Sequence, residues 1–247
     1  MAKRNDGRAW DEIRPINIIR NYLNDPEGSV LIEVGNTKVI CTVSVEYKLP
    51  TFIREEDLDI GWVTAEYDML PRSTSKRILR DRLAGQIRGR SQEIQRLIGR
   101  CLRTVTDLSA IPARTIYVDC DVIQADGGTR TAAINGSFVA LYDAFTKMKE
   151  KKQINRMPIN NFLGAVSLGI VEGELLLDLT YSEDSMADVD MNIVKNDQGK
   201  YIEIQGTAEG QAFSHEQLND MMKLADKGIR EVINLQRKLL FSNPENK

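Results

Sequence analysis

The chain has 247 residues, of which 42% are hydrophobic and 28% are charged, and its formal net charge at pH 7 is −3. This balance is typical of a globular protein with a sizeable core and excludes a wholly disordered chain. No stretch approaches the ~18 consecutive apolar residues of a membrane span, and the opening residues lack the apolar run of a signal peptide. We therefore expect a cytoplasmic protein. Because no linker rich in Pro, Gly or Ser interrupts it, we also expect a single domain over residues 1–247.

Hydrophobic periodicity predicts a series of strands and helices along the chain. In chain order we expect a hairpin over residues 29–47 turning at Gly35 and Asn36, a helix over 91–105, a strand over 115–124, a helix over 131–148, a second hairpin over 165–181 turning near Glu172 and Gly173, a strand over 201–208, and a helix from Ser214 to about Leu240. Hairpins with helices between them favour an α+β layer structure, with mixed sheets and packed helices, over a regular repeat of strand-helix-strand units.

The cysteines and the histidine are poor candidates for chemistry. Cys41, Cys101 and Cys120 lie far apart among apolar neighbours, which is typical of buried reduced thiols. The one histidine, His215, follows Ser214, which has the spacing of a capping box with Gln217. The sequence therefore does not have the residues for a metal site of paired His or Cys ligands, and its single histidine makes a Ser-His-Asp triad a poor candidate. Carboxylates, arginines and backbone amides remain as candidate groups.

Two glycines stand between the expected strand 115–124 and the expected helix 131–148. Gly127 and Gly128 allow the backbone to approach a ligand closely, and the amides at the start of a helix attract anions. Thr129 adds a hydroxyl donor and Arg130 a planar cation suited to phosphate oxygens. The segment is neither a P-loop nor a dinucleotide turn, so a small phosphate-like anion is the favoured ligand. The alternative is an ordinary glycine turn with a solvated arginine.

A second arginine precedes the expected helix 91–105. Arg90 has the helical spacing of the apolar residues Ile94, Leu97 and Cys101, so a helix extended back by one turn would place it on the buried stripe. A buried arginine needs an anionic partner. In the alternative, Ser91 caps the helix and Arg90 lies outside it.

Positive charge is concentrated between Arg72 and Arg103. This stretch contains ten cations and two anions, a local net charge of +8, which leaves −11 for the rest of a chain whose total is −3. Concentrated arginine on an acidic protein indicates a polyphosphate partner, with nucleic acid as the favoured class. A solvated helix face accounts well for Arg96, Arg100 and Arg103. It accounts less well for the segment PRSTSKRILR, which lacks apolar periodicity and reads as a loop.

Five acids fall within thirteen residues of the segment LLLDLTYSEDSMADVDMN: Asp178, Glu183, Asp184, Asp188 and Asp190. Carboxylates this close repel one another unless a cation or solvent separates them. A solvated turn is the default interpretation. Asp184 and Asp190, however, adjoin strand-like stretches, and two carboxylates could hold a Mg²⁺ ion that meets phosphate oxygens.

The chain resembles the ribonuclease PH family of phosphate-dependent 3′→5′ exoribonucleases. The motifs that carry the resemblance span nearly the whole chain in order: NDGRAWDEIRP, PEGSVLIEVGNTKVICTVSVE, GWVTAEYDMLPRST, GRSQEIQRLIGRCLR, DCDVIQADGGTRTAAINGSFVA, LLLDLTYSEDSMADVDMN and EIQGTAEG. The resemblance implies the fold of ribosomal protein S5 domain 2 and a ring-shaped homohexamer, a trimer of dimers. It also implies trimming of transfer RNA precursors by reversible transfer of nucleotides to inorganic phosphate, with ribosomal RNA as a second candidate substrate.

The same resemblance assigns roles to residues of this sequence. It implies a phosphate site at Arg90, Gly128, Thr129 and Arg130 and catalytic, Mg²⁺-binding acids at Asp184 and Asp190. Asp184 is favoured as proton donor and Asp190 as metal ligand, although the sequence leaves the two roles open and Asp184 could serve both. We assign Arg72, Arg77 and Arg80 to gripping the body of the RNA; salt bridges within a dimer are the alternative.

Two other classes of function remain open. A metal-dependent hydrolytic nuclease would use carboxylates and arginines but needs no second anion site. A non-catalytic RNA-binding ring subunit would be expected to lack one of the acids or phosphate-site arginines, and this sequence has them all.

Overall fold

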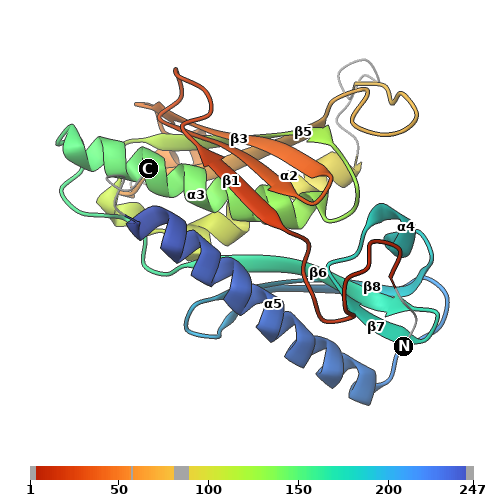
Figure 1. The fold of residues 1–247 in the computed structure, drawn as a ribbon. Coiled ribbons are helices and arrows are strands. Elements are labelled where there is room, and N and C mark those ends of the chain that lie inside the picture. Colours follow the sequence, from red (N-terminus) through yellow and green to blue (C-terminus); the bar gives the residue numbers. More distant parts are fainter. Residues whose placement is uncertain (1–3, 57, 81–88, 243–247) are drawn as a thin grey trace. The chain divides into compact units, whose positions relative to one another are not determined.

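The computed structural model describes residues 4–56, 58–80 and 89–242, drawn in Figure 1. The chain divides into two compact units, one made of Pro15–Asn161 and the other of Met1–Arg14 with Phe162–Lys247. Each unit contains one sheet, and the mixed sheets with packed helices confirm the expected α+β fold. That residues 1–247 act as a single domain stays a prediction.

The sheet of the unit Pro15–Asn161 has five strands in the order β1-β2-β3-β5-β4. Their bounds are β1 Ile16–Arg20, β2 Gly28–Val34, β3 Thr37–Glu46, β5 Thr115–Gln124 and β4 Trp62–Met69. Neighbouring strands are antiparallel except β4 and β5, which run parallel. A parallel pair needs a crossover, and the helix α2 (Gly89–Thr104) lies within the connection between β4 and β5.

Helices α2 and α3 (Thr129–Glu150) pack on this sheet, α2 on β4 and α3 on β2 and β3. Figure 1 shows α3 lying along the sheet. The approach is close at Gly136, where a Cβ atom would come within 2.9 Å of the Cys41 sulfur. The described part of this unit also contains the short helix α1 (Thr51–Glu55) and the 3-10 helix η2 (Leu108–Ala110). All three cysteines are buried and none forms a disulfide in the described chain, as predicted.

The other unit holds an antiparallel sheet in the order β7-β6-β8-β9. Its elements are β6 Leu163–Val171, β7 Glu174–Leu177, α4 Tyr181–Asp184, β8 Ala187–Asn196, β9 Tyr201–Ala208 and α5 His215–Phe241. The long helix α5 packs on β6. Ser214 and Gln217 form the predicted capping box at its start, with each side chain bonded to the other residue's backbone.

The predicted elements are confirmed, with small changes at their ends. The two hairpins turn at Gly35-Asn36 and at Glu172-Gly173, and the helix expected over 131–148 begins two residues earlier, at Thr129. Strands β1, β4 and β8 and the helices α1 and α4 were not predicted.

Candidate functional site

The glycine turn before α3 has the predicted backbone geometry. Gly127 and Gly128 have φ angles of 76° and 64°, in the left-handed region that glycine enters without steric cost. Gly128 is the N-cap of α3, and no side chain caps it. The Ala132 amide donates to the Gly128 carbonyl at 3.0 Å, as expected at the start of a helix. The first amides of an α-helix have no acceptor within the helix itself, so this helix end suits an anion.

A buried threonine from β3 fixes the turn. The Asp126 amide donates to the Thr37 Oγ1 atom at 2.9 Å, and the Thr37 hydroxyl donates to the Gly127 carbonyl at 2.7 Å. Thr37 has no exposed surface. Because one side chain bonds both ends of this short stretch, the glycines are held in shape before any ligand arrives.

The hydroxyl of Tyr67 contacts Thr129 and is influenced by the charges of both arginines. The Tyr67 hydroxyl donates to Thr129 Oγ1 at 2.9 Å, and both residues are buried. Burial raises the pKa of Tyr67, while the positive charges of Arg90 and Arg130 oppose this rise. Both charges act on the same hydroxyl, so three of the predicted phosphate-site side chains share one neighbourhood.

The two arginines differ in exposure. Helix α2 begins at Gly89 and includes Arg90, which confirms the interpretation of a helix extended back beyond Ser91. Ser91 is therefore not the N-cap of α2. The expectation that Arg90 is buried is wrong, because its place in the first turn leaves its side chain exposed at the helix end. The Arg130 side chain is only 15% exposed, and its guanidinium lies 3.6 Å from the carboxylate of Glu93.

The N-terminal segment neutralises two of the five clustered acids. Arg4 donates to both carboxylate oxygens of Glu183, at 2.8 and 2.7 Å. Arg14 binds both oxygens of Asp178 in the same way, at 2.8 and 2.7 Å, and Arg8 lies 3.4 Å from that carboxylate. Asp178 and Glu183 are buried, so the default of a solvated turn is wrong for them. Sequence reasoning missed these partners, although the two arginines of the motif NDGRAWDEIRP, with Arg4 directly before it, were a usable signal.

Asp184 and Asp190 remain accessible. Asp184 is exposed at the end of α4, a single helical turn whose capping box joins Thr180 and Glu183. Asp190 is half-buried in β8, between Gly169 of β6 and Thr207 of β9. Asp190 therefore lies in a strand rather than in a turn. The ion pairs of Glu183 fix the residue directly before Asp184. The backbone that carries the Asp184 side chain is therefore held rigidly.

The basic segment has the expected loop structure. Arg72, Arg77 and Arg80 are all exposed in the loop that follows β4. The Ala125 amide donates to the Ser73 carbonyl at 2.8 Å, which ties the loop to the chain two residues before Gly127. Arg82 and Arg88, which contributed to the predicted basic stretch, lie outside the described residues.

The arginines on α2 fit a solvated face only in part. Arg96 and Arg100 are exposed. The Arg103 guanidinium instead lies 4.4 Å from the centre of the Trp62 ring and donates to the Val63 carbonyl at 2.8 Å. Arg103 therefore has a packing role at the edge of the sheet.

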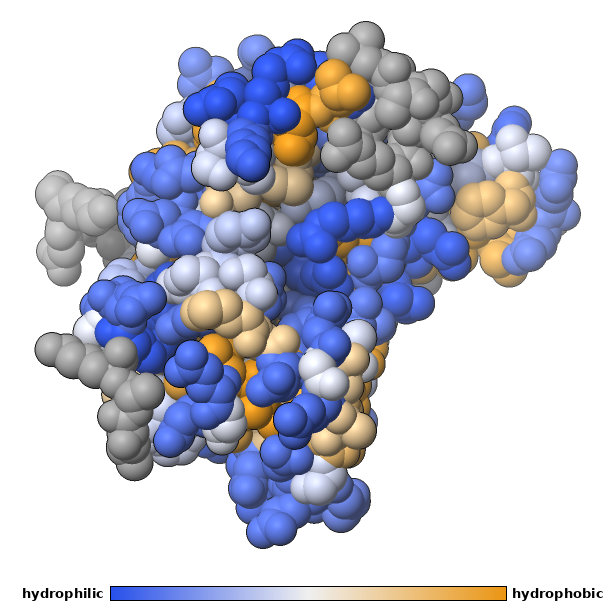
Figure 2. All heavy atoms as spheres, turned by 90° about the vertical axis from the view of Figure 1, so that its right-hand side faces the viewer, coloured by the Kyte–Doolittle hydropathy of each residue, from blue (hydrophilic) through white to orange (hydrophobic). Residues whose placement is uncertain are grey.

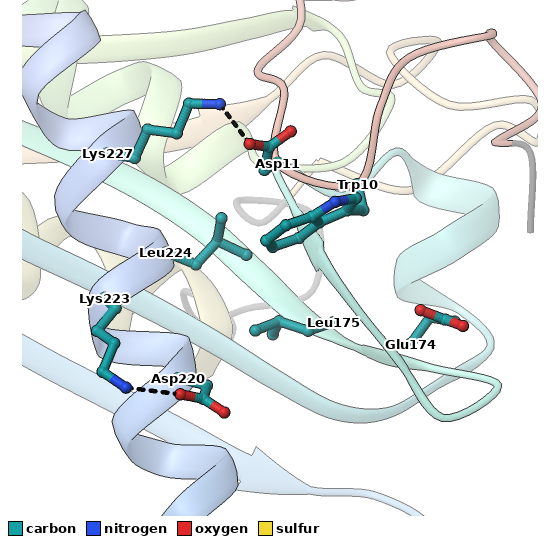
Figure 3. A pocket seen from close by; sticks show the side chains of 8 residues that line it. All are labelled: Trp10, Asp11, Glu174, Leu175, Asp220, Lys223, Leu224 and Lys227. Carbon is teal, nitrogen blue, oxygen red and sulfur yellow. Dashed lines mark hydrogen bonds and ion pairs between the residues drawn. The ribbon is translucent and has the colours of Figure 1, made fainter. Parts of the chain in front are cut away.

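A separate pocket of about 500 Å³ lies in the unit that contains α5. Its apolar part is formed by Trp10, Leu175 and Leu224 (Figure 3). Its two lysines already form ion pairs with neighbouring aspartates, at 2.6 and 2.9 Å. None of the predicted site residues is among the described residues that line it.

Within the described ranges no helix is long and apolar enough to cross a membrane. Hydrophilic residues cover most of the face shown in Figure 2.

Comparison with solved structures places the fold. A rice (Oryza sativa) Rrp46 structure matches with a TM-score of 0.77 and 21% sequence identity, covering 96% of this chain and all of that chain. A structure described as an Archaeoglobus fulgidus exosome with RNA bound to the active site also matches with a TM-score of 0.77, at 22% identity, covering 96% of this chain and 91% of the other. At these identities the likeness shows the fold alone.

Comparison with sequences places the family. Residues 12–147 match the model of the 3′ exoribonuclease family, domain 1, and residues 161–228 match the model of its domain 2. Proteins named Ribonuclease PH from two Bacillus cereus strains, G9842 and AH187, are 52% and 51% identical over 236 residues, which cover 95% of this chain and 96% of each relative. The resemblance drawn from the motifs is confirmed: the chain belongs to the 3′ exoribonuclease family, whose ribonuclease PH members it matches over nearly its whole length.

Proposed function

We propose that the protein is a phosphate-dependent 3′→5′ exoribonuclease that trims transfer RNA precursors and transfers each terminal nucleotide to inorganic phosphate. One observation carries this proposal. A rigid, anion-suited turn at Gly127-Gly128, with Thr129, Arg90 and Arg130 around one buried hydroxyl, occurs in a chain of the 3′ exoribonuclease family. A nuclease that used water as nucleophile would have no need of a site for a second anion.

In the proposed reaction the attacking phosphate becomes part of the product, where a phosphoanhydride bond joins it to the released nucleotide. A phosphate oxygen attacks the phosphorus of the last phosphodiester, the bond from that phosphorus to the 3′ oxygen breaks, and a nucleoside diphosphate leaves. The shortened RNA keeps the 3′ oxygen and takes up a proton. Arg90 and Arg130 hold the attacking phosphate by charge and bidentate hydrogen bonds, and the Gly128–Thr129 helix start fixes its orientation.

The acids act on the leaving oxygen. Asp184, exposed at the end of α4, is the favoured proton donor, and Asp190, half-buried on β8, the favoured metal ligand. Within the described residues no group of three or more His, Cys, Asp and Glu could hold a metal ion. Two carboxylates suit Mg²⁺, which commonly keeps several waters and shares substrate phosphates. When bound by Asp184 and Asp190, Mg²⁺ would stabilise negative charge that develops during the transfer.

The remaining elements of the proposal concern partners and place. Arg72, Arg77 and Arg80 grip the body of the RNA, because they are exposed cations on a loop that is anchored beside the glycine turn. The chain assembles as a homohexamer, a trimer of dimers, residues 1–247 act as one domain, and the protein works in the cytoplasm on transfer RNA precursors and on ribosomal RNA.

The test is an assay with labelled transfer RNA that carries a 3′ extension, incubated with and without phosphate and with and without Mg²⁺. The proposal predicts shortening that requires both, with nucleoside diphosphates as products. Equal activity in phosphate-free buffer with release of monophosphates would favour a hydrolytic nuclease. RNA binding without shortening under every condition would favour a non-catalytic RNA-binding subunit.

A further inference from the structure

We propose that Tyr67 is a positioning residue for phosphate, which acts by fixing the hydroxyl of Thr129 as a donor to the attacking anion. The inference rests on the function proposed above and adds a residue to the site. Tyr67 belongs to β4, whereas the other phosphate-site residues come from α2 and from the start of α3. Its proximity to them arises from the parallel pairing of β4 with β5, in which Tyr67 lies opposite Cys120.

The hydrogen bond between the two side chains has a defined direction. The Tyr67 hydroxyl donates and Thr129 Oγ1 accepts, at 2.9 Å. Because the threonine oxygen is the acceptor, the hydrogen on Thr129 remains available to donate elsewhere. Burial raises the pKa of Tyr67, so the phenol keeps its proton around neutral pH and remains the donor.

Rigidity makes this arrangement effective. Tyr67 is 3% exposed and Thr129 5% exposed, so water does not compete for this bond. Thr129 is the first residue of α3, and the bond restricts its χ1 rotamer. The Thr129 hydroxyl is therefore held at the start of the helix, next to the Thr129 amide. Without Tyr67, Thr129 could rotate its hydroxyl toward a backbone carbonyl, as threonines near helix ends often do.

The buried phenol also shapes the electrostatics of the site. The charges of Arg90 and Arg130 both act on the Tyr67 hydroxyl and oppose the rise of its pKa that burial causes. A neutral hydroxyl does not pair with the cations, whereas a carboxylate would. Tyr67 thus holds the donor in place without adding to the negative charge of Glu93, which already lies 3.6 Å from Arg130.

The experiment compares Tyr67→Phe with the wild type in steady-state phosphorolysis, varying phosphate and RNA separately. The variant loses one hydroxyl and keeps the ring, so we expect KM for phosphate to rise about five- to tenfold, the equivalent of one net hydrogen bond. We expect kcat at saturating phosphate and KM for RNA to change less than about twofold. An unchanged KM for phosphate, or an equal loss in kcat, overturns the proposal.

Two further variants separate positioning from general packing. Thr106→Val removes a buried hydroxyl that donates to the Leu102 carbonyl at 2.8 Å, at the other end of α2, and should leave both KM values unchanged. In a Thr129→Val background the Tyr67→Phe change should have no further effect on KM for phosphate, because Tyr67 acts through Thr129. An equal effect in both backgrounds overturns the proposal.

The test remains decisive if Tyr67→Phe does not fold. Thr129→Ser keeps the hydroxyl that Tyr67 orients and should retain a KM for phosphate close to that of the wild type, whereas Thr129→Val should raise it. Equal KM values for the two overturn the proposal. Failure of the proposed function looks different, because the wild type itself would then release monophosphates without added phosphate.

Discussion

The buried ion pair between Arg4 and Glu183 should contribute strongly to stability, and Arg4→Met tests it. The two side chains are 2% and 8% exposed, and their closest atoms are 2.7 Å apart. At an effective dielectric constant of about 20, unit charges at this distance attract by about 6 kcal/mol, most of which offsets the desolvation of both groups. Removing Arg4 leaves a buried carboxylate whose nearest remaining cation, Arg8, lies 3.9 Å away, and this costs about 3–5 kcal/mol of unfolding free energy.

The loss should depend on pH in a defined direction. Burial alone would raise the pKa of Glu183, but hydrogen bonds from Arg4 and the Thr180 amide outweigh it, so the pKa is lowered from its usual 4.5. A lowered pKa stabilises the fold above the unfolded-state value and loses that effect as pH falls through the folded-state value. Without Arg4, burial dominates and the Glu183 pKa rises. The difference between the two proteins should therefore be largest near neutral pH and shrink as pH approaches 4.5.

Urea unfolding followed by circular dichroism, from about pH 7 down to about pH 4.5, measures this difference. Lys223→Met is the matched control, because it breaks an ion pair of the same unit whose side chains are 78% and 53% exposed, and it should cost less than about 1 kcal/mol. Adding Glu183→Gln to Arg4→Met should restore at least about 1 kcal/mol. A loss below about 1 kcal/mol at neutral pH, or one independent of pH, would refute the reasoning.

Three other predictions concern the reaction itself. Asp184→Asn and Asp190→Asn should each abolish turnover and leave RNA binding nearly intact, because both acids serve charge that develops in the transition state; near wild-type turnover in single-turnover assays would remove that residue from the site. Arg90→Ala and Arg130→Ala should chiefly raise the phosphate concentration needed for half-maximal rate, so an unchanged dependence on phosphate would contradict the assignment. Replacing the three loop arginines with alanine should weaken precursor binding and lower its salt slope by about 0.7–0.9 per residue, while a short oligonucleotide is degraded normally. Light scattering on this variant of Arg72, Arg77 and Arg80 should show an intact hexamer. An intact hexamer that binds transfer RNA normally would contradict the RNA-gripping role, and a dissociated one would favour the alternative of dimer salt bridges.

Local signals made much of the fold predictable from the sequence. Each confirmed turn or cap depends on residues within a few positions of one another, as at Gly35-Asn36 or in the pairing of Ser214 with Gln217. The crossover that pairs β4 with β5 in parallel depends on segments about fifty residues apart and has no local signature. Strand β8 was hidden for another reason, because its alternating aspartates suggested a solvated turn.

The site could be predicted only where its chemistry is local. The turn at Gly127-Gly128 combined glycines, a hydroxyl and a cation in adjacent positions, and its backbone has the geometry expected of it. The partners of Glu183 could not be deduced, because Arg4 lies 179 residues away in sequence. Tyr67 was missed likewise, since an apolar-looking position in a strand gives no indication that its hydroxyl reaches the start of a helix.

The fate of isotopically labelled oxygen tests the central claim most directly. RNA with a 3′ extension is degraded once with ¹⁸O-labelled phosphate in ordinary water and once with ordinary phosphate in ¹⁸O-labelled water, and the released nucleotides are analysed by mass spectrometry. Attack by phosphate predicts nucleoside diphosphates that carry the label from phosphate and none from water. Nucleoside monophosphates that carry label from water, and none from phosphate, would contradict the account.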